Sequence, residues 1–170
     1  NKSEKLLHNI MPKSIAEKLK NNIKTISMDN PEISVLFADI VSFTEMSEKI
    51  SSEKIVGFLN DMFSQFDDLT ETYGVEKIKT IGDSYMVVSG MPVQKEDHAL
   101  TLFNLAKEMI KISAQFKDHN GNPIKLRIGI NSGPAISGVI GKSKFAFDVW
   151  GDTINTAARL ESYGTPDCIH

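Results

Sequence analysis

The sequence predicts an α+β domain with a ferredoxin-like, split βαβ (βαββαβ) sheet that carries an extra strand pair and a helix at its C-terminal end. Three observations support this fold class. Strand-like runs and longer runs of helical periodicity follow one another in the order strand, helix, hairpin, helix, strand. A Gly-Asp turn joins the two central strands, and a strand pair and a helix come after the last strand. We therefore expect a mostly antiparallel sheet with helices on one face.

The first half of the domain begins with a buried strand and a long helix. The run ISVLFADI, residues 33–40, is rich in β-branched and apolar residues, which is typical of a central strand. Residues 51–74 then place apolar side chains on one helical stripe. Ser51 or Ser52 supplies the N-cap of this helix, and Gly74 ends it.

A hairpin follows this helix. Its two strands, residues 77–81 and 85–89, flank Gly82 and Asp83. Glycine tolerates a positive φ and aspartate bonds to its own backbone, so this pair suits a tight turn.

The second half repeats the alternation of helix and strand. A second amphipathic helix covers residues 97–117, and a turn leads into a strand over 124–133. Two shorter strands are predicted over 135–141 and 145–151, and a last helix over 153–163.

The N-terminal segment forms two short amphipathic pieces that are divided by Pro12. Two interpretations remain open, a connector or dimer-contacting arm and a helix packed on its own domain. We divide the chain into a helical connector from an upstream region, residues 1–30, and one main domain, residues 31–170.

The composition limits the classes of partner and compartment. The formal net charge of −3 argues against a protein that grips nucleic acid along a basic stripe. The single cysteine excludes a disulfide framework and indicates a reducing compartment. The sequence has no apolar run of about 20 residues, which is the length that a membrane-spanning helix needs. We expect a cytoplasmic domain, which fits a membrane-anchored or multidomain parent protein.

Two aspartates are predicted to meet at one corner of the sheet. The first strand and the central hairpin lie side by side in this topology, so Asp39 approaches Asp83 at the hairpin tip. Two carboxylates about 4 Å apart repel by roughly 4 kcal/mol at an effective dielectric of 20. A divalent cation compensates this repulsion, and the backbone amides of residues 40–44 can bind phosphate at a helix start. The ordinary alternative is a cap residue and a turn residue.

Three further polar residues need an explanation. Alternation places Lys79 on the opposite side of its strand from its apolar neighbours, so its ammonium needs a partner or an exposed cleft. Asn155 and Arg159 have the i, i+4 spacing and share one helix face, where they can contact phosphate and ribose. A solvated helix face is the alternative for this pair.

Four motifs in order carry a family resemblance. The segments VLFADIVSFT, KIKTIGDSYMVVSG, LRIGINSGPAISGVIG and FDVWGDTINTAARLES together resemble the class III nucleotidyl cyclases, the adenylyl and guanylyl cyclase catalytic domains. The resemblance runs from about Ile33 to Gly164, and the N-terminal helices are similar to the linker before many such domains. It implies a homodimer whose two sites, at the subunit interface, convert a nucleoside triphosphate to its cyclic monophosphate and pyrophosphate.

The resemblance also implies roles for single residues. Asp39 and Asp83 match the ligands of two Mg²⁺ or Mn²⁺ ions, with the backbone carbonyl of Ile40 as a further ligand. The backbone of Phe43 and Thr44 matches the segment that contacts the phosphates.

The other half of each site is expected from the second subunit. Lys79 and Asp148 match the base-selecting positions, and Asn155 and Arg159 match the residues on ribose and phosphate. Lysine only donates and ionised aspartate only accepts, which fits N1 and the 6-amino group of adenine. Guanylyl cyclases of this family carry Glu and Cys at these positions, so we expect an adenylyl cyclase that uses ATP.

Other readings stay open. They are a guanylyl cyclase, a catalytically silent module that binds nucleotide or only dimerises, and another two-metal nucleotidyl transferase such as a diguanylate cyclase. Cyclases of this family usually continue into further strands that bear a lysine for the transition state. We therefore expect the domain to be truncated at its C-terminal end and to turn over feebly.

Overall fold

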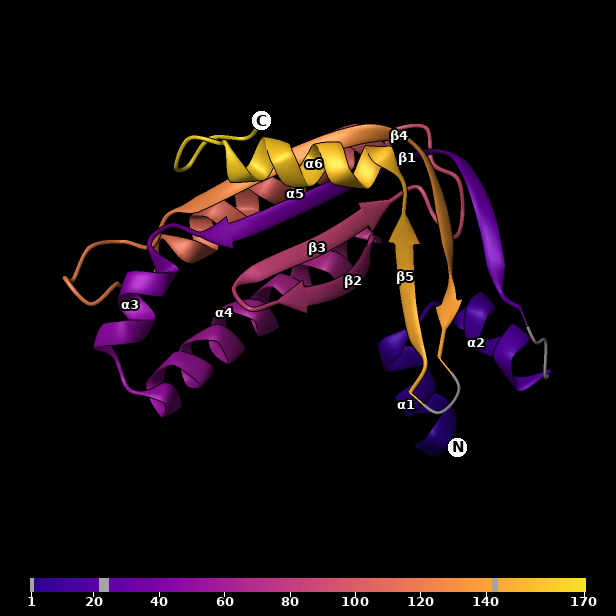
Figure 1. Ribbon diagram of the computed structural model, residues 1–170, viewed down its shortest axis with the longest axis horizontal. Helices are drawn as coiled ribbons and strands as arrows, with labels where there is room; N and C mark the ends of the chain where they lie inside the picture. The colour runs from indigo at the N-terminus through magenta and orange to yellow at the C-terminus, as the bar shows by residue number, and fades with distance from the viewer. Residues whose placement is uncertain (1, 22–24, 142–143) are drawn as a thin grey trace.

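A computed structural model describes residues 2–21, 25–141 and 144–170 of the chain (Figure 1). Residues 22–24 of the predicted connector lie outside the described residues. The described elements are α1 (Lys2–Ile10), α2 (Lys13–Lys20), β1 (Ser27–Ile40), α3 (Phe43–Lys49), α4 (Ser52–Tyr73), β2 (Glu76–Ile81), β3 (Ser84–Ser89), α5 (His98–Ser113), β4 (Leu126–Ile140), β5 (Ala146–Trp150) and α6 (Asp152–Ser162).

The predicted fold class is confirmed. The strands form a five-stranded sheet in the order β2-β3-β1-β4-β5, in which every neighbouring pair is antiparallel. The elements β1, α4, β2, β3, α5 and β4 follow one another as the split βαβ arrangement requires. The chain places β1 between β3 and β4, so the C-terminal end of β1 lies beside the β2–β3 turn.

One prediction about the strands is wrong. The predicted strands over 124–133 and 135–141 are a single strand, β4, which pairs with β1 in its first part and with β5 at its end. Proline has no N–H for the ladder, which by itself favours a break in the strand at Pro134. The register shift between Asn30 and Ile33 of β1 lies opposite Pro134 and allows the strand to continue.

The prediction that the helices cover one face is also wrong. Leu36 and Ala38 of β1 pack in a cluster with α4 and α5, whereas Val35 and Phe37 pack in a second cluster with α2 and α6. Figure 1 shows α6 lying along β4 and β1. The run at 33–40 is apolar on both sides, and such a strand needs cover on both faces.

The two N-terminal helices differ in burial. No side chain of α1 is buried, whereas α2 buries Ile15 and Ala16 in the second cluster. Lys20 and Glu4 form an ion pair between the two helices. Among the described residues, we find no helix whose length and apolarity would allow it to span a membrane.

Local signals explain several element ends. Ser51 caps α4 by accepting a hydrogen bond from Lys54 N at 3.4 Å, and Gly74 ends α4 in the left-handed conformation. Gly129 allows α6 to lie directly on β4, because a Cβ there would stand 2.3 Å from Glu161 N and 2.6 Å from Ala157 O.

Candidate active site

The end of β1 and the β2–β3 turn bring Asp39 and Asp83 to one corner of the sheet. The pairing of Ala38 with Tyr85 sets the register of this corner. The backbone N–H of Ile40 donates to Asp83 Oδ2 at 3.0 Å, so the turn is bonded directly to the strand end. The two carboxylates are therefore neighbours in the folded chain.

The corner is crowded with negative charge. Burial raises the pKa of Asp83 above its usual range, and the charge of Asp39 raises it further. The hydrogen bond from Ile40 and the charge of Arg127 act in the opposite direction. Asp39 Oδ1 is buried and accepts no hydrogen bond from an N–H or hydroxyl group of the described residues. This oxygen lacks the ordinary donor that a buried carboxylate requires.

Two residues that sequence reasoning missed complete this corner. Arg127 lies opposite Asp39 on β4, with its Nη1 atom 3.9 Å from Asp39 Oδ2. Glu161 of α6 is only 6% exposed. Burial raises its pKa to about 8, with the hydrogen bond to Asp39 and the charge of Asp39 adding to the shift. We call Asp39, Asp83, Arg127 and Glu161 the carboxylate corner.

The carboxylate corner offers oxygen ligands that suit a hard divalent cation. Asp39 Oδ1 has no donor, the Asp83 carboxylate lies beside it, and the backbone carbonyl of Ile40 belongs to the same strand end. Mg²⁺ is usually held by one or two carboxylates and substrate phosphates rather than by an all-protein cage. In the described ranges, no group of three or more His, Cys, Asp and Glu side chains is arranged to hold a metal ion. The donors present therefore fit a site that the substrate completes.

Helix α3 begins directly after β1. Ser42 precedes it with a φ of 61°, and the first hydrogen bond of the helix runs from Met46 N to Ser42 O at 3.1 Å. The amides of Phe43 and Thr44 therefore come before the intrahelical bonds begin and are not used by them. Phe43 and Thr44 follow Ile40 by three and four residues, so both amides lie at the start of α3, close to the end of β1.

Helix α3 also contacts the turn that carries His119. His119 Nε2 lies 3.4 Å from Glu45 Oε1, and the His119 side chain is only 10% exposed. Asp118 Oδ1 fixes the turn that carries His119, because it accepts from the backbone N–H groups of Asn120 and Asn122.

Lys79 and Asp148 form an ion pair in the folded chain. Lys79 Nζ donates to Asp148 Oδ2 at 2.7 Å, and Val149 N donates to Asp148 Oδ1 at 2.8 Å. The two residues lie on β2 and β5, the opposite edges of the sheet. The sheet is curved strongly enough for these edge strands to meet, and Figure 1 shows β5 running across the end of the β2–β3 pair. The partner that the Lys79 ammonium needs is Asp148.

Asn155 and Arg159 lie on the exposed side of α6. Arg159 Nη2 donates to Thr156 Oγ1 at 3.3 Å and lies 3.9 Å from Asp152 Oδ1, so its contacts stay within its own helix. No hydrogen bond or ion pair within residues 2–21, 25–141 and 144–170 joins either side chain to the carboxylate corner or to the Lys79–Asp148 pair. The predicted site residues thus form separate groups in one chain.

Comparison with known proteins decides the family. The profile of the adenylate and guanylate cyclase catalytic domain matches residues 25–170. This chain belongs to that cyclase family. The predicted class III nucleotidyl cyclase resemblance is therefore confirmed.

Relatives of this cyclase domain include both adenylate and guanylate cyclases. An adenylate cyclase of Mycobacterium tuberculosis is 49% identical over 162 residues, which cover 95% of this chain and 37% of the relative. The guanylate cyclase soluble subunit beta-2 of Rattus norvegicus is 41% identical over 171 residues, which cover 99% of this chain and 25% of the relative. The chain spans about a third or less of the length of these relatives.

A solved structure supports the fold and the family. The catalytic core of a rhodopsin-guanylyl cyclase with converted specificity, in complex with ATPαS, matches with a TM-score of 0.79 and 38% identity. The match covers 84% of this chain and 78% of that one. The relatives of this nucleotidyl cyclase domain thus include proteins named as adenylate cyclases and proteins named as guanylate cyclases.

Proposed function

We propose that this cyclase domain is an adenylyl cyclase, which converts ATP to 3′,5′-cyclic AMP and pyrophosphate. The Lys79–Asp148 ion pair carries the proposal. A lysine that donates to N1 and an aspartate that accepts from the 6-amino group match adenine. Guanine presents an acceptor at O6 and a donor at N1, so the same pair would leave polar groups unmatched. A site built on such bonds discriminates strongly against the wrong base.

The carboxylate corner would hold two Mg²⁺ or Mn²⁺ ions through Asp39, Asp83 and the backbone carbonyl of Ile40. When bound, such ions lower the pKa of the attacking ribose 3′-hydroxyl and neutralise charge on the leaving pyrophosphate. The orphaned Asp39 Oδ1 and the raised pKa of Asp83 support this assignment.

The chain's own groups supply positioning and charge. The free amides of Phe43 and Thr44 would bind phosphate oxygens at the start of α3. Asn155 would orient the ribose, and Arg159 would neutralise charge that develops on the phosphates. The chemistry then needs no side-chain nucleophile, because phosphoryl transfer depends mostly on position and charge.

We further propose a homodimer with its active sites at the subunit interface. In one chain, Arg159 turns to its own helix while the carboxylate corner lies elsewhere. Large apolar side chains stay exposed along the β4–β5 pair, namely Ile136, Ile140 and Trp150. A second copy would cover apolar surface and bring Asn155 and Arg159 to the other copy's carboxylates. The helices α1 and α2 would connect this domain to an upstream sensor or membrane domain of a longer protein.

Product analysis tests the activity directly. The purified protein is incubated with ATP or GTP and with Mg²⁺ or Mn²⁺, and the nucleotides are separated by chromatography. Cyclic AMP with ATP, and little cyclic GMP with GTP, is the expected result. Cyclic GMP as the main product would favour a guanylyl cyclase, which the rat relative at 41% identity makes the second candidate. Binding of nucleotide without product would favour a silent module.

Mixing two inactive variants tests the shared interface. Asp83→Asn and Arg159→Ala remove groups from the two halves of a site. If each site takes one half from each subunit, a heterodimer of the two variants has one intact site and regains part of the activity. Failure to regain activity in verified heterodimers would contradict a shared site.

A further inference from the structure

The start of α6 is bonded to β4 through two side chains that donate to backbone carbonyls. Thr153 Oγ1 donates to Pro134 O at 2.7 Å, and Asn131 Nδ2 donates to Thr153 O at 3.2 Å. Thr153 is only 6% exposed. Its hydroxyl lies against the backbone of Gly133, where a Cβ would stand 2.6 Å from Oγ1. We call Asn131, Gly133, Pro134 and Thr153 the α6 clamp.

The irregular register of β1 makes the carbonyl of Pro134 available to the α6 clamp. The pairing of β1 with β4 steps from Ala135 opposite Asn30 to Gly133 opposite Ile33 and skips Pro134. A carbonyl that the ladder does not pair needs another donor. Thr153 supplies that donor, so the irregularity that allows β4 to continue also sets where α6 begins.

The N-cap residue of α6 is a glycine. Gly151 has no side chain that could bond to the first amides of the helix, so the α6 clamp takes over the fixing of its first turn. Further along, Gly129 lets Ala157 and Glu161 approach the backbone of β4. The inner side of α6 is therefore attached to β4 at its start and again near its end.

The inner and outer sides of α6 carry different residues. Thr153 and Ala157 are buried, whereas Asn155 and Arg159 are exposed. Each residue of an α-helix turns the side-chain direction by about 100°, so Asn155 points to the opposite side of the helix from Thr153. Fixing the inner side therefore fixes the directions in which Asn155 and Arg159 point.

We propose that Thr153 is a positioning residue for Asn155 and Arg159. This inference rests on the proposed function, in which these two side chains contact the ribose and the phosphates. Thr153 itself bonds to β4 on the inner side of the helix. Without its hydroxyl, the first turn of α6 is held less tightly, and Asn155 is displaced with it. A displacement of about 1 Å at a reacting group can cost about 10²-fold in rate.

Thr153→Val tests this role, because valine has nearly the shape of threonine and lacks the hydroxyl. With ATP and Mn²⁺, it should lower kcat by about tenfold or more and change KM by less than about threefold. The effect falls on kcat because Asn155 and Arg159 act most strongly in the transition state. Thr153→Ser restores the donor and should return kcat to within about threefold of the unaltered chain.

A double variant separates positioning from a general loss of stability. In the Asn155→Ala background, Thr153→Val should lower kcat by less than about threefold, because one of the groups that it positions is already gone.

Thr70→Val is the matched control. Thr70 is also 6% exposed, and its hydroxyl also donates to a backbone carbonyl at 2.7 Å, that of Asp67 on α4. It should lower Tm by an amount similar to that of Thr153→Val and keep kcat within about twofold of the unaltered chain.

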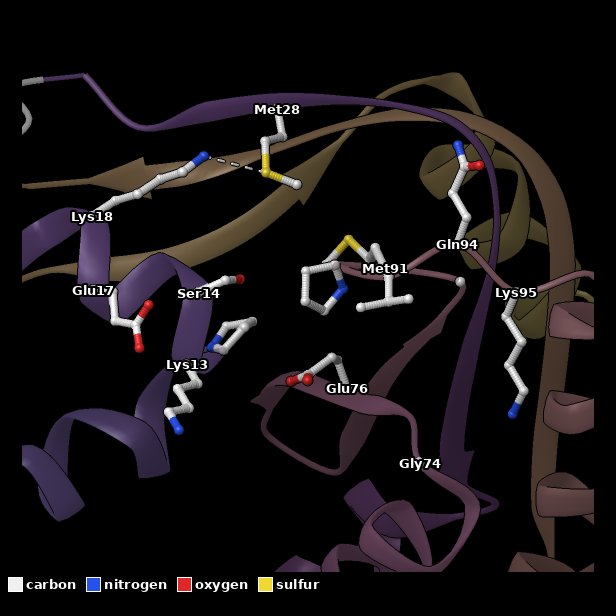
Figure 2. Close-up of a pocket in the computed structure, with 14 residues that line it drawn as sticks. Lys13, Ser14, Glu17, Lys18, Met28, Gly74, Glu76, Met91, Gln94 and Lys95 are labelled. Carbon is white, nitrogen blue, oxygen red and sulfur yellow. Dashed lines mark hydrogen bonds between the residues drawn. The ribbon is translucent and has the colours of Figure 1, made fainter.

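Amide hydrogen exchange locates the change without using activity. Thr153→Val should speed exchange in the first turn of α6. Exchange in α2, which lines the cavity shown in Figure 2 and not the contact between β4 and α6, should stay the same.

Three outcomes would overturn the positioning role. They are unchanged kcat in the folded Thr153→Val variant, an equal loss of kcat in Thr70→Val, and an undiminished effect of Thr153→Val in the Asn155→Ala background. An unaltered chain that forms no cyclic nucleotide would instead overturn the proposed function and this inference with it.

A second variant decides the matter if Thr153→Val does not fold. Asn131→Leu removes the other hydrogen bond of the α6 clamp. It should lower kcat by about threefold or more, and this loss should shrink in the Asn155→Ala background. Unchanged kcat in the folded Asn131→Leu variant would contradict the α6 clamp.

Discussion

The carboxylate corner and the exposed side of α6 are unlike in almost every physical respect. In the corner, Asp39, Asp83 and Glu161 are crowded together, and burial raises the pKa of both Asp83 and Glu161. On α6, Arg159 and Asn155 face solvent, and Arg159 contacts only its own helix. The corner sets three carboxyl groups against one cation, Arg127, whereas the exposed side of α6 presents Arg159 to solvent.

The two regions therefore need different partners. Crowded carboxylates store repulsion that a bound cation removes, so the corner is expected to respond to metal even in an isolated chain. Exposed arginine and asparagine gain little until another surface excludes water around them. The Lys79–Asp148 pair stands between these cases, because its two charges already compensate each other.

The largest effect is expected in the corner. Asp83→Asn should lower kcat by at least about 10²–10³-fold, because it removes charge needed where charge develops in the reaction. The fold should survive, since the asparagine oxygen can still accept from Ile40 N. Steady-state kinetics and circular dichroism measure both effects. Asp61→Asn, an exposed change on α4, is the control, and near-normal kcat in Asp83→Asn would remove the corner from the chemistry.

A smaller effect is expected at the ion pair. Lys79→Glu combined with Asp148→Cys should shift the ratio of kcat/KM for ATP and GTP toward GTP by about tenfold or more. Each single change should mainly lower the rate with ATP, because one charge of the pair is then left alone. An unchanged ratio in the folded double variant would show that other residues select the base.

The stability of the metal-free protein should depend on pH through Glu161. Its pKa in the folded chain is about 8, above the ordinary 4.5. The stability that this residue contributes is therefore present at acid pH and is lost as the pH rises from about 4.5 through 8. Glu161→Gln should flatten this loss and make the protein more stable at pH 9 by about 1–3 kcal/mol.

Urea unfolding across this pH range, with a chelator present, measures that dependence. Glu71→Gln, which changes an exposed carboxylate on α4, is the matched control and should keep the slope of the parent chain. A parent chain whose stability rises over the same range would contradict the burial argument for Glu161.

The smallest effect is expected beside α3. Glu45→Gln weakens the contact with His119 and should speed amide hydrogen exchange in α3. KM for ATP should rise about twofold to fivefold while kcat stays the same, because a single polar contact to a partly exposed side chain contributes less than about 1 kcal/mol. His8→Gln, on exposed α1, serves as the control. Unchanged exchange in α3 would mean that the core contact of Met46 alone holds this helix.

Much of the fold and part of the site were predictable from the sequence. The apolar run at 33–40 and the Gly82–Asp83 turn predicted a strand end beside a hairpin tip, because strand order and turn chemistry are local signals. The structure places Asp39 and Asp83 at that corner. Lys79 signalled a missing partner, since a lone ammonium in an apolar strand is unusual.

The remaining features depend on three-dimensional packing. The contact of Lys79 with Asp148 joins opposite edges of the sheet, so sheet curvature decides it. Glu161 reads as an ordinary polar helix residue, and its burial follows only from the close approach of α6 to β4. The continuity of β4 across Pro134 likewise depends on the irregular register of β1.

The glycine at position 129 also decides what can move. Backbone lies against backbone there, so no layer of side chains is available to deform between α6 and β4. Helix and strand shift only as one stiff piece. The helix is then a lever, with Arg159 on its outer side and Glu161 against Asp39 on its inner side. A displacement of the outer side of α6 is therefore transmitted to Asp39.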